Sequence, residues 1–498
     1  MSERTKGVML SYVYIVVHLA VSLINTPLIL HYAGDSEYGL YQIVASFVSS
    51  ITIFETSIAS GVLRFYCNAL SHGKQKDPEN VLAIAKKIYH YLSMFMVVIG
   101  VCLVCLFRSF YKSSFTPHEI SEGSILLALL IVNCVIVIQN SIYLSSITAN
   151  EKFVFIRIIA IGSQVSILVL NFLLLRFFPY AITVLSVQVV VNSIVAFIRY
   201  LYSRNILKVR VVLHDNDKKL LKDILLFSGT ILLASLADQI FWKADQVILG
   251  KLYSTSIVAI YAIGTQVYNN YMTVGLQVSS VFFPKLSRLY SEEDGIEKLS
   301  TQFINVGRIT YYIVFLVLSG FFIFGKEFVY LWVGLNYKDA YYIALLVMIP
   351  FTIDLIQHTG LSILEIINQY AFRAKIYLLS AVLNIISTII LAKLYGGIGA
   401  ALSTGITMFI TSGLVMNWYY ARRVGLNIKR FWKEMAIITI KLIPLTVVAA
   451  FVNEHITVDP SWHRLIIKII AYTIMYFALV YAVMNSYERN IVKTIIKI

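Results

Sequence analysis

Charged residues are scarce in this chain. Asp, Glu, Lys and Arg together make up 13% of its 498 residues, whereas apolar residues make up 59%. So few charges cannot cover the surface of a conventional water-soluble protein, in which about 25% of the residues are charged. The composition therefore excludes a soluble domain and indicates a chain that lies mostly in a membrane.

Residues that bind metals or take part in redox chemistry are also few. The chain has four cysteines, and Cys102 and Cys105 form a C-x-x-C spacing without His or a further Cys nearby. Because both lie inside a hydrophobic stretch, we interpret them as small apolar packing residues rather than as a metal or redox site. We expect no metal ion and no organic cofactor.

A nucleotide-binding loop is missing as well. The segment from Gly320 to Lys326 reads G-x-x-x-x-G-K, but Glu327 stands where the phosphate-binding loop requires Ser or Thr. The segment also ends a hydrophobic stretch, and it does not join a strand to a helix. The sequence therefore predicts no intrinsic ATPase activity.

About fourteen hydrophobic stretches, each long enough to cross a bilayer, follow one another along the chain. They lack the alternating pattern of barrel strands and are much longer than the roughly 10 residues of such a strand, so they predict helices. The first stretch is too long for the core of a signal peptide and predicts a retained helix. The predicted spans lie near residues 8–30, 39–62, 83–107, 123–149, 153–176, 180–203, 224–250, 256–282, 304–325, 340–367, 374–394, 398–420, 435–453 and 463–485.

The basic residues fall mainly in alternate gaps between these stretches. Lys and Arg beside short loops remain on the cytoplasmic side, so the pattern predicts that both termini are cytoplasmic. The cluster from Arg199 to Lys222 is placed on that side. Much of the formal net charge of +15 is then a topology signal and an attraction to anionic lipid, and it does not indicate a nucleic-acid partner.

The chain resembles itself at an offset near 220 residues, over about 200 residues. Tyr41 aligns with Tyr261 and Ser71 with Ser291, and the lengths of the spans and the charges of the loops match. Two repeats of six helices insert the same way up, so we expect a pseudo-two-fold axis along the membrane normal.

The predicted fold is an all-α polytopic membrane protein of about 14 transmembrane helices, arranged as two six-helix lobes plus two C-terminal helices. The predicted domains are an N-terminal lobe at 1–203, a cytoplasmic linker at 204–222, a C-terminal lobe at 223–421, and the last two helices with a cytoplasmic tail at 422–498.

Ionisable side chains gather in a few of the predicted spans. Each costs about 2.5–3.5 kcal/mol at a helix centre and therefore normally faces protein or water. In the repeat, Asp238 aligns with His18 and Asp245 with Asn25, so the leading spans of the two lobes carry polar groups at matching depths. The polar face of the seventh span consists of Asp238, Gln239, Trp242, Lys243, Asp245 and Gln246.

Two further spans carry charge. Asp354, His358 and Glu365 recur on one face of the tenth span, and Glu55 and Arg64 lie in the second. Such groups can satisfy one another as buried ion pairs, and Arg64 can snorkel to the inner interface. The alternative that we favour is that the charges of these spans line a water-filled translocation cavity.

Segments of the second, seventh and eighth spans resemble a known family. They are Glu37-Tyr38-Gly39-Leu40-Tyr41, Phe54-Glu55, Arg64-Phe65-Tyr66, Asp245-Gln246-Val247-Ile248-Leu249-Gly250 and Ile260-Tyr261-Ala262. They resemble bacterial polysaccharide (O-antigen, Wzx-type) flippases of the multidrug/oligosaccharidyl-lipid/polysaccharide (MOP) exporter superfamily. Gln246 departs from the pattern, because a basic residue often stands there in that family.

The resemblance implies a flippase and not an enzyme. Its substrate is expected to be a polyprenyl-diphosphate-linked oligosaccharide, such as an O-antigen unit of lipopolysaccharide. The protein would move it from the cytoplasmic to the outer leaflet of the bacterial cytoplasmic (inner) membrane by alternating access. Further partners implied are membrane lipids and a downstream polysaccharide polymerase with its assembly proteins.

The resemblance also suggests a role for each polar group, with no catalytic residue among them. Lys243 and Arg64 are candidates for binding the diphosphate. Candidates for bonding the glycan are Asn25, Gln239, Trp242, Gln246, Tyr268, Asn269 and Asn270. Candidates for coupling to a proton or a sodium ion, or for charging the cavity, are Glu55, Asp238, Asp245, Asp354, His358 and Glu365.

Other functions fit parts of the pattern. A peptidoglycan-precursor flippase of the lipid II type shares the fourteen spans and the need to bind a diphosphate, and a cation-coupled multidrug exporter shares the repeat but usually has twelve spans. A small-solute symporter is a further alternative. A membrane polysaccharide polymerase or glycosyltransferase would need a sizeable extramembrane loop, and no outer loop predicted here exceeds about 20 residues.

Overall fold

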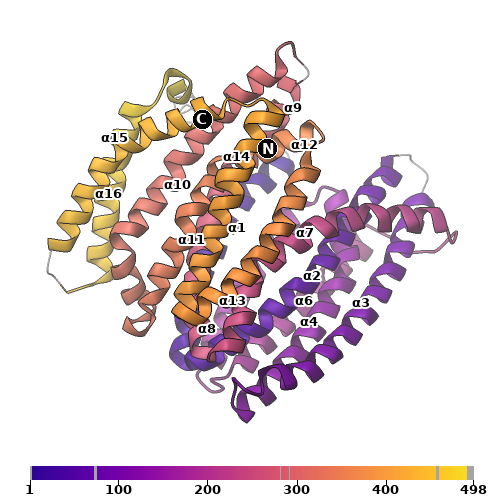
Figure 1. Ribbon diagram of the computed structural model, residues 1–498. Helices are drawn as coiled ribbons and strands as arrows, with labels where there is room; N and C mark the ends of the chain where they lie inside the picture. The colour runs from indigo at the N-terminus through magenta and orange to yellow at the C-terminus, as the bar shows by residue number, and fades with distance from the viewer. Residues whose placement is uncertain (1–2, 72–75, 281, 291, 456–458, 491–498) are drawn as a thin grey trace. The chain divides into compact units, whose positions relative to one another are not determined.

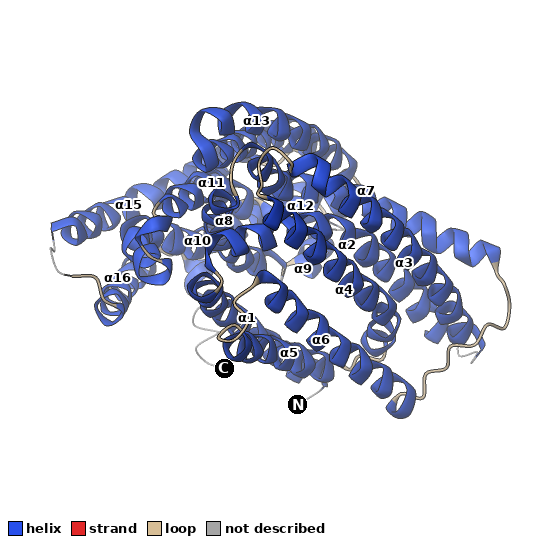
Figure 2. Ribbon diagram, turned by 90° about the horizontal axis from the view of Figure 1, so that it is seen from below, coloured by secondary structure: helices blue, strands red, loops and turns tan. Residues whose placement is uncertain are grey.

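The structure is a computed structural model that describes residues 3–71, 76–280, 282–290, 292–455 and 459–490. Within these ranges every regular element is a helix and none is a strand (Figure 2). The prediction of an all-helical chain is confirmed. The end of the predicted cytoplasmic tail, beyond Asn490, lies outside the described residues.

Contacts divide the chain into two compact units, Met1–Ala259 and Ile260–Ile498. The first unit contains the helices from α1 to the start of α8, most of which are long and apolar (Figure 1). They are α1 (Glu3–Tyr32), α2 (Gly34–Ser71), α3 (Lys76–Tyr111), α4 (Pro117–Ala149), α5 (Phe153–Leu174), α6 (Ala181–Leu201), a π-helical turn (Tyr202–Ile206), α7 (Lys218–Leu252) and the start of α8 (Thr255–Ser280).

Helix α2 is the centre of the first unit. It packs against α3, α4 and α7, while α1 packs along α5 and α6 packs on α4 and α5. Fully buried apolar side chains from four of these helices meet in one core, among them Val62, Tyr89, Ile138 and Ile224. Burial of such side chains contributes about 1.5–3 kcal/mol each in water, whereas in a bilayer close packing takes over that role.

The second unit contains the remaining helices. They are the rest of α8, then α9 (Phe283–Tyr290), α10 (Gly295–Val333), a 3₁₀ turn (Leu335–Tyr337), α11 (Asp339–Ile356), α12 (His358–Ile366), α13 (Tyr370–Met408), a π-helical segment (Phe409–Val415), α14 (Met416–Tyr419), a second π-helical turn (Tyr420–Val424), α15 (Ile428–His455) and α16 (Trp462–Val483).

Helices α15 and α16 dock on α10 and lie beside it in Figure 1. Polar contacts fix both ends of this packing. Near one end Lys468 of α16 forms an ion pair of 2.8 Å with Glu327 of α10. Near the other end, Arg308 of α10 pairs with Glu488 at 2.5 Å. Glu327, which spoils the nucleotide-binding motif, therefore has a structural role in joining two helices.

Helix α13 contains a break at Gly396, whose φ of 60° and ψ of −139° are not helical. Glycine occupies this region of backbone space without the cost that a side chain would bring. The break falls between the predicted eleventh and twelfth spans, at 374–394 and 398–420, so the structure separates these two stretches where the sequence predicts a boundary.

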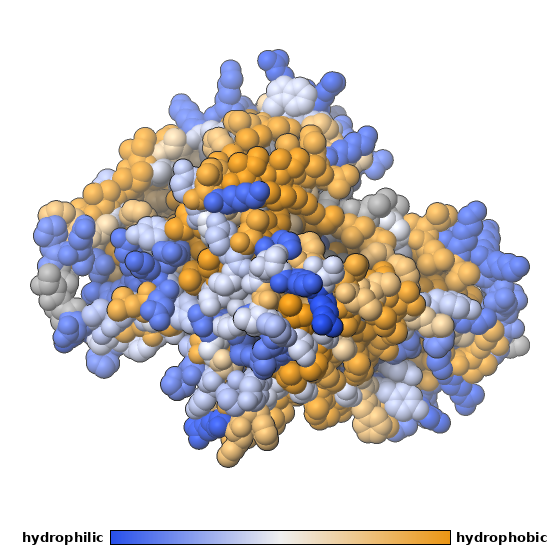
Figure 3. All heavy atoms as spheres, turned by 60° about the horizontal axis from the view of Figure 1, so that its bottom comes forward, coloured by the Kyte–Doolittle hydropathy of each residue, from blue (hydrophilic) through white to orange (hydrophobic). Residues whose placement is uncertain are grey.

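Within the described ranges, ten helical segments are long and apolar enough to cross a membrane, or eleven if the bent α2 is included. Large side chains such as Ile440 and Leu394 are more than 60% exposed. Figure 3 shows that hydrophobic side chains form broad continuous areas on one face. Such areas on long apolar helices mark a surface that faces lipid, so the chain is a multi-pass membrane protein.

Two finer predictions about the architecture are not settled by this packing. Helices occupy all fourteen predicted stretches, but the count of fourteen spans and the six-plus-six symmetry remain predictions. Contacts group α7 with the first unit, because it packs along α2, whereas the repeat assigns it to the second lobe. The predicted domain limits at 203, 222 and 421 likewise remain predictions.

Candidate functional site

The predicted polar face of the seventh span lies on α7. This helix begins at Asp217, whose carboxylate accepts hydrogen bonds from the backbone N–H groups of Lys219 and Leu220, both at 2.9 Å. Asp245 and Gln246 are both 2% exposed, and the Ser46 hydroxyl of α2 donates a hydrogen bond to the Gln246 side-chain oxygen. This part of the face therefore points into the contact with α2.

Lys243 is half-buried on the same helix. Within the described part of the chain it forms neither a hydrogen bond nor an ion pair, and Gln239, one turn before it, has a buried side-chain oxygen without a partner there. An ammonium group in a membrane-spanning segment normally finds a counter-charge or water. Lys243 is thus a cation available to an anionic ligand. Asp238 and Trp242 are half-buried and have interactions of their own.

Glu55 of α2 is 8% exposed and accepts a hydrogen bond from the Ser141 hydroxyl of α4. The cation that acts on it electrostatically is Arg199 of α6. The sequence missed this pair, because Arg199 was grouped with the cytoplasmic cluster although it falls inside the predicted span 180–203. The position within an apolar stretch was the signal that could have revealed it.

Arg64, the second candidate for the diphosphate, lies on the outside of α2 and is exposed. Its guanidinium carbon is 4.4 Å from the ring centre of Phe227 on α7, within cation–π range. The planar guanidinium group leaves most of its donors free in such a stack. Arg64 is therefore held against α7 while it stays accessible to a phosphate.

Asn25, a candidate for the glycan, has a partner within the first unit. The Asn171 amide of α5 donates to the Asn25 side-chain oxygen of α1 at 3.0 Å. A similar amide pair, unpredicted from the sequence, joins Asn192 of α6 to Asn133 of α4 at 2.8 Å. Both pairs bridge helices inside the bundle, which is how polar side chains usually hold membrane helices together.

The predicted charges of the tenth span lie in the second unit. Asp354 of α11 accepts hydrogen bonds from the Tyr377 hydroxyl at 2.9 Å and from the Ser412 hydroxyl at 2.8 Å. Arg373 of α13 lies over the ring of Tyr377 at 4.2 Å, and both Asp354 and Arg373 act electrostatically on His358. The sequence did not point to these residues, because Tyr377 and Ser412 reach Asp354 from other segments and Arg373 packs on Tyr377.

The remaining candidates of the second unit differ in exposure. Glu365 is exposed at the end of α12, where Arg373 is the cation that acts on it. On α8, Tyr268 is 1% exposed, whereas Asn269 and Asn270 are half-buried. Asp354, His358 and Glu365 thus share one cluster with Arg373, and the α8 candidates are not part of it by any contact described.

The predicted set thus falls into two groups by unit. Asn25, Glu55, Arg64 and the polar face of α7 belong to the first unit, and the α8 residues with Asp354, His358 and Glu365 belong to the second. Among the described residues, no group of three His, Cys, Asp or Glu is placed to hold a metal ion. Each group offers charges and amides for binding.

Comparison with known proteins identifies the family. The family described as polysaccharide biosynthesis protein matches residues 33–342, more than half of the chain. The chain belongs to this family. No curated protein matches it. The family resemblance expected from the sequence is confirmed, since the second-span and seventh-span segments that carry it both lie inside the matched region.

Solved structures show the same fold in transporters of low sequence identity. The lipid II flippase MurJ in an inward closed conformation has a TM-score of 0.75 and 15% identity over 98% of this chain and 99% of that one. An inward-facing multidrug resistance MATE family transporter of the MOP superfamily has a TM-score of 0.68 and 13% identity over 84% and 99%. A MOP superfamily transporter from Pyrococcus furiosus Vc1 has a TM-score of 0.57 and 13% identity over 86% and 97%. The fold of this family member is therefore that of MOP transporters.

Proposed function

We propose that this protein is a flippase that carries a polyprenyl-diphosphate-linked oligosaccharide from the cytoplasmic to the outer leaflet of a bacterial inner membrane, with both termini in the cytoplasm. Membership in a polysaccharide biosynthesis family supports the class of substrate, and the MOP fold supports transport. The observation that carries the proposal concerns Lys243 on α7, whose ammonium group forms no hydrogen bond or ion pair with the described residues.

Physical chemistry explains why such a cation is needed. A dianionic diphosphate and a glycan rich in hydroxyl groups cannot enter hydrocarbon without losing their hydration, which costs several kcal/mol for each unsatisfied group. A cavity that offers cations for the phosphates and amides for the hydroxyls replaces that hydration, while the lipid tail stays in the bilayer. Lys243 and Arg64 would bind the diphosphate, and the amides and aromatic groups of α1, α7 and α8 would bind the glycan.

Transport would follow alternating access, in which the protein switches between an inward-open and an outward-open state. The two states would differ in their affinity for the substrate. Glu55 and Asp354 are the proposed coupling groups, because each is a carboxylate that accepts from hydroxyl donors. Arg199 acts on Glu55, and Arg373 lies against the ring of Tyr377, one of the donors to Asp354. A proton or sodium ion taken up in one state and released in the other would bias the cycle. Asp238 and Asp245 would contribute charge in the first unit, and His358 and Glu365 would do so in the second.

A lipid II-type flippase is the second candidate. It is favoured by the likeness to MurJ, which extends over 98% of this chain and so includes the two C-terminal helices α15 and α16. A multidrug exporter is supported only by the shorter likeness, over 84% of the chain. The two flippases share the diphosphate and differ in the sugar, so substrate competition separates them.

The test is binding and transfer in liposomes with three probes: an undecaprenyl-diphosphate oligosaccharide, lipid II and a lipophilic cationic dye. A lost charge-assisted hydrogen bond costs about 1.5–3 kcal/mol, so Lys243→Ala should weaken binding of the oligosaccharide lipid by about 10-fold to 150-fold. The matched control is Lys251→Ala, which removes a charge at the end of α7, where Lys251 donates to Ser113 at 3.1 Å.

Each result has a clear reading. Transfer of the oligosaccharide lipid, lost in Lys243→Ala and kept in Lys251→Ala, supports the proposal. Transfer of lipid II alone selects the second candidate. Transfer of the dye alone would overturn both flippase assignments and leave a multidrug exporter.

A further inference from the structure

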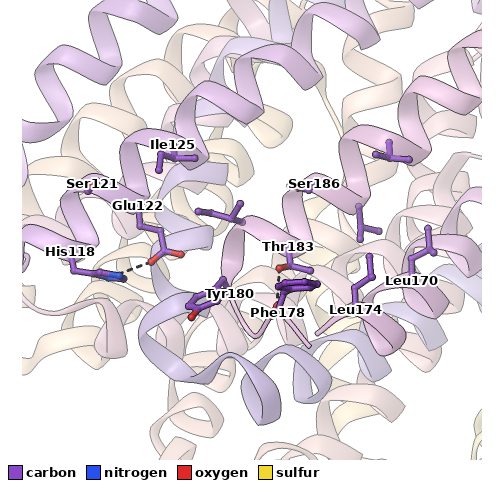
Figure 4. A pocket seen from close by; sticks show the side chains of 13 residues that line it. His118, Ser121, Glu122, Ile125, Leu170, Leu174, Phe178, Tyr180, Thr183 and Ser186 are labelled. Atoms are coloured by element: carbon purple, nitrogen blue, oxygen red, sulfur yellow. Dashed lines mark hydrogen bonds and ion pairs between the residues drawn. The ribbon is translucent and has the colours of Figure 1, made fainter. Parts of the chain in front are cut away.

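A cavity lined by none of the proposed transport residues lies where the ends of three helices of the first unit meet. It has a volume of about 730 Å³ and opens between the start of α4, the end of α5 and the start of α6 (Figure 4). Most of its wall is apolar, with Leu170, Leu174 and Val190 among the lining residues. At one end the wall carries Glu122 and His118. The volume is within the range of about 300–1,000 Å³ that is typical of small-molecule sites.

Glu122 has an unsatisfied carboxylate at this cavity. The residue is 5% exposed, and neither of its oxygens accepts a hydrogen bond within the described part of the chain. The ring of His118 lies nearby: its Nδ1 is 3.7 Å from one carboxylate oxygen, and its side chain is 77% exposed. A buried polar group without a partner costs about 1–3 kcal/mol, and a charged one costs more. The site is therefore built to receive a hydrogen-bond donor, preferably a cationic one.

The groups around Glu122 add further negative charge. Glu37 of α2 lies beside it, close enough for the two carboxyl groups to share a proton, and Glu119 acts on it electrostatically. Both of these neighbouring carboxylates already accept hydrogen bonds. Glu37 accepts from the backbone N–H of Ala181 at 2.7 Å, and Glu119 accepts from Ser36 and Thr255, each at 2.8 Å. Glu122 has only the proton that it can share with Glu37, and among the described residues no N–H or hydroxyl group donates to it.

The cavity opens toward lipid. Ile125 of α4 and Val190 of α6, which both line the cavity, are 48% and 52% exposed, and they belong to the candidate spans Pro117–Ala149 and Ala181–Ile206. Because the charged end of the cavity lies at the ends of these spans, it sits at the depth where lipid head groups begin. An occupant from the bilayer would thus meet the carboxylate with its head group and the apolar wall with its chain.

We propose that this cavity binds an amine-bearing phospholipid, with the ammonium group donating to the Glu122 carboxylate, His118 at the head-group level beside the phosphate, and one acyl chain along Leu170, Leu174 and Val190. The match is one of charge as well as shape. An ammonium group supplies the donors and the positive charge that Glu122 lacks. A lipid with an anionic head group would instead bring a third or fourth negative charge to the trio.

The test measures lipid binding and not transport. Purified protein in detergent is mixed with equal amounts of phosphatidylethanolamine and phosphatidylglycerol of the same acyl chains, and the bound lipids are counted by native mass spectrometry. Wild type should prefer phosphatidylethanolamine by tenfold or more, and Glu122→Gln should bring the ratio close to one. Glu297→Gln removes an exposed carboxylate of α10 and should leave the preference unchanged.

A pair of tryptophan variants tests the cavity itself without touching the carboxylate. Val190→Trp should fill it and abolish the bound phosphatidylethanolamine. Val169→Trp is the matched control, since Val169 is 48% exposed on α5 and does not line the cavity. Both variants place a large side chain on an exposed position, so both should fold.

Three outcomes would overturn the proposal. Equal binding of the two lipids to wild type would mean that the cavity recognises apolar chains alone. A preference that survives in Glu122→Gln would mean that the ammonium group binds elsewhere. Binding of the soluble cation tetraphenylphosphonium, blocked by Val190→Trp, without any bound phosphatidylethanolamine would assign the site to soluble lipophilic cations.

Discussion

Glu55 of α2 and Ser141 of α4 are joined by a hydrogen bond that the serine hydroxyl donates to the carboxylate. Arg199 of α6 supplies the positive charge that acts on the same carboxylate. Three helices of the first unit thus converge on one buried acidic group. Such a group costs little to keep ionised only while its donors and counter-charge remain in place, and this makes it sensitive to substitution.

Glu55→Gln should disable transport more than it disables folding. The amide keeps the shape and a hydrogen-bond acceptor for Ser141 but leaves Arg199 without its counter-charge, so we expect the rate of substrate transfer to fall tenfold or more. Ser141→Ala is the control, because it removes the hydrogen bond and keeps both charges; we expect less than a threefold change in rate. A loss in Ser141→Ala as large as that in Glu55→Gln would mean that the charge alone does not explain the effect and that the hydrogen bond is needed as well.

The glycine of the family-like segment at 37–41 has a structural explanation. A Cβ on Gly39 would collide with the backbone carbonyl of Thr255, at the point where α2 meets the start of α8. Backbone atoms cannot move aside as a side-chain tip can, so Gly39→Ala should destabilise the protein by about 1–3 kcal/mol. Gly162→Ala on α5 is the matched control. Nothing lies near its Cβ, and alanine should stabilise that helix by about 0.5–1 kcal/mol.

These two variants are compared by thermal unfolding in detergent, followed through the fluorescence of the five tryptophans. A melting temperature that falls for Gly39→Ala and holds or rises for Gly162→Ala would support the close approach. A Gly39→Ala protein as stable as wild type would show that the two helices can separate at this point without cost.

The segment that follows α16 is held at Glu488 by an arginine. Arg308 of α10 is 5% exposed and donates to Glu488 at 2.5 Å and 3.1 Å and to Glu434 at 2.5 Å. Removing one partner of a buried pair leaves the other uncompensated and costs about 3–5 kcal/mol. Arg308→Met should therefore lower the melting temperature strongly, whereas the double variant Arg308→Met/Glu488→Gln should recover part of the loss. A double variant no more stable than the single one would contradict this reading.

Much of the fold could be predicted from hydropathy. The positions of the helices follow from long runs of apolar residues, since a helix satisfies its backbone groups within its own segment in lipid. The break at Gly396 falls where the predicted spans 374–394 and 398–420 separate. The family resemblance could also be predicted, because the segments that carry it are local. The symmetry, the lobe limits and the exact number of spans are not decided by these features.

The partners of the polar residues could not be predicted, for a geometric reason. Hydropathy places a residue along the membrane normal, but the rotation of a helix about its axis decides which neighbour it meets, and a few residues of error in the start of a span change that rotation completely. Gln246 was assigned to the glycan and is bonded to Ser46, and Arg199 was placed in a loop and acts on Glu55. Glu122 was not singled out at all.

The clearest test of ion coupling is Asp354. Its carboxylate accepts hydrogen bonds from Tyr377 and Ser412, and Arg373 lies against the ring of Tyr377, so the site holds a negative charge between fixed donors. If Asp354 takes up the coupling ion, Asp354→Asn cannot release or bind it in step with the cycle. Transfer in liposomes should then become independent of an imposed proton or sodium gradient, while equilibrium binding of the lipid-linked substrate stays within threefold of wild type.

Two further variants make the Asp354 result specific. Tyr377→Phe removes one donor and keeps the carboxylate, so it should weaken the response to the gradient without abolishing it. Asp339→Asn removes a carboxylate at the start of the same helix, α11, and should leave the response intact. If the gradient accelerates Asp354→Asn as much as wild type, the coupling ion binds elsewhere, and Glu55, the other proposed coupling group, becomes the group to examine.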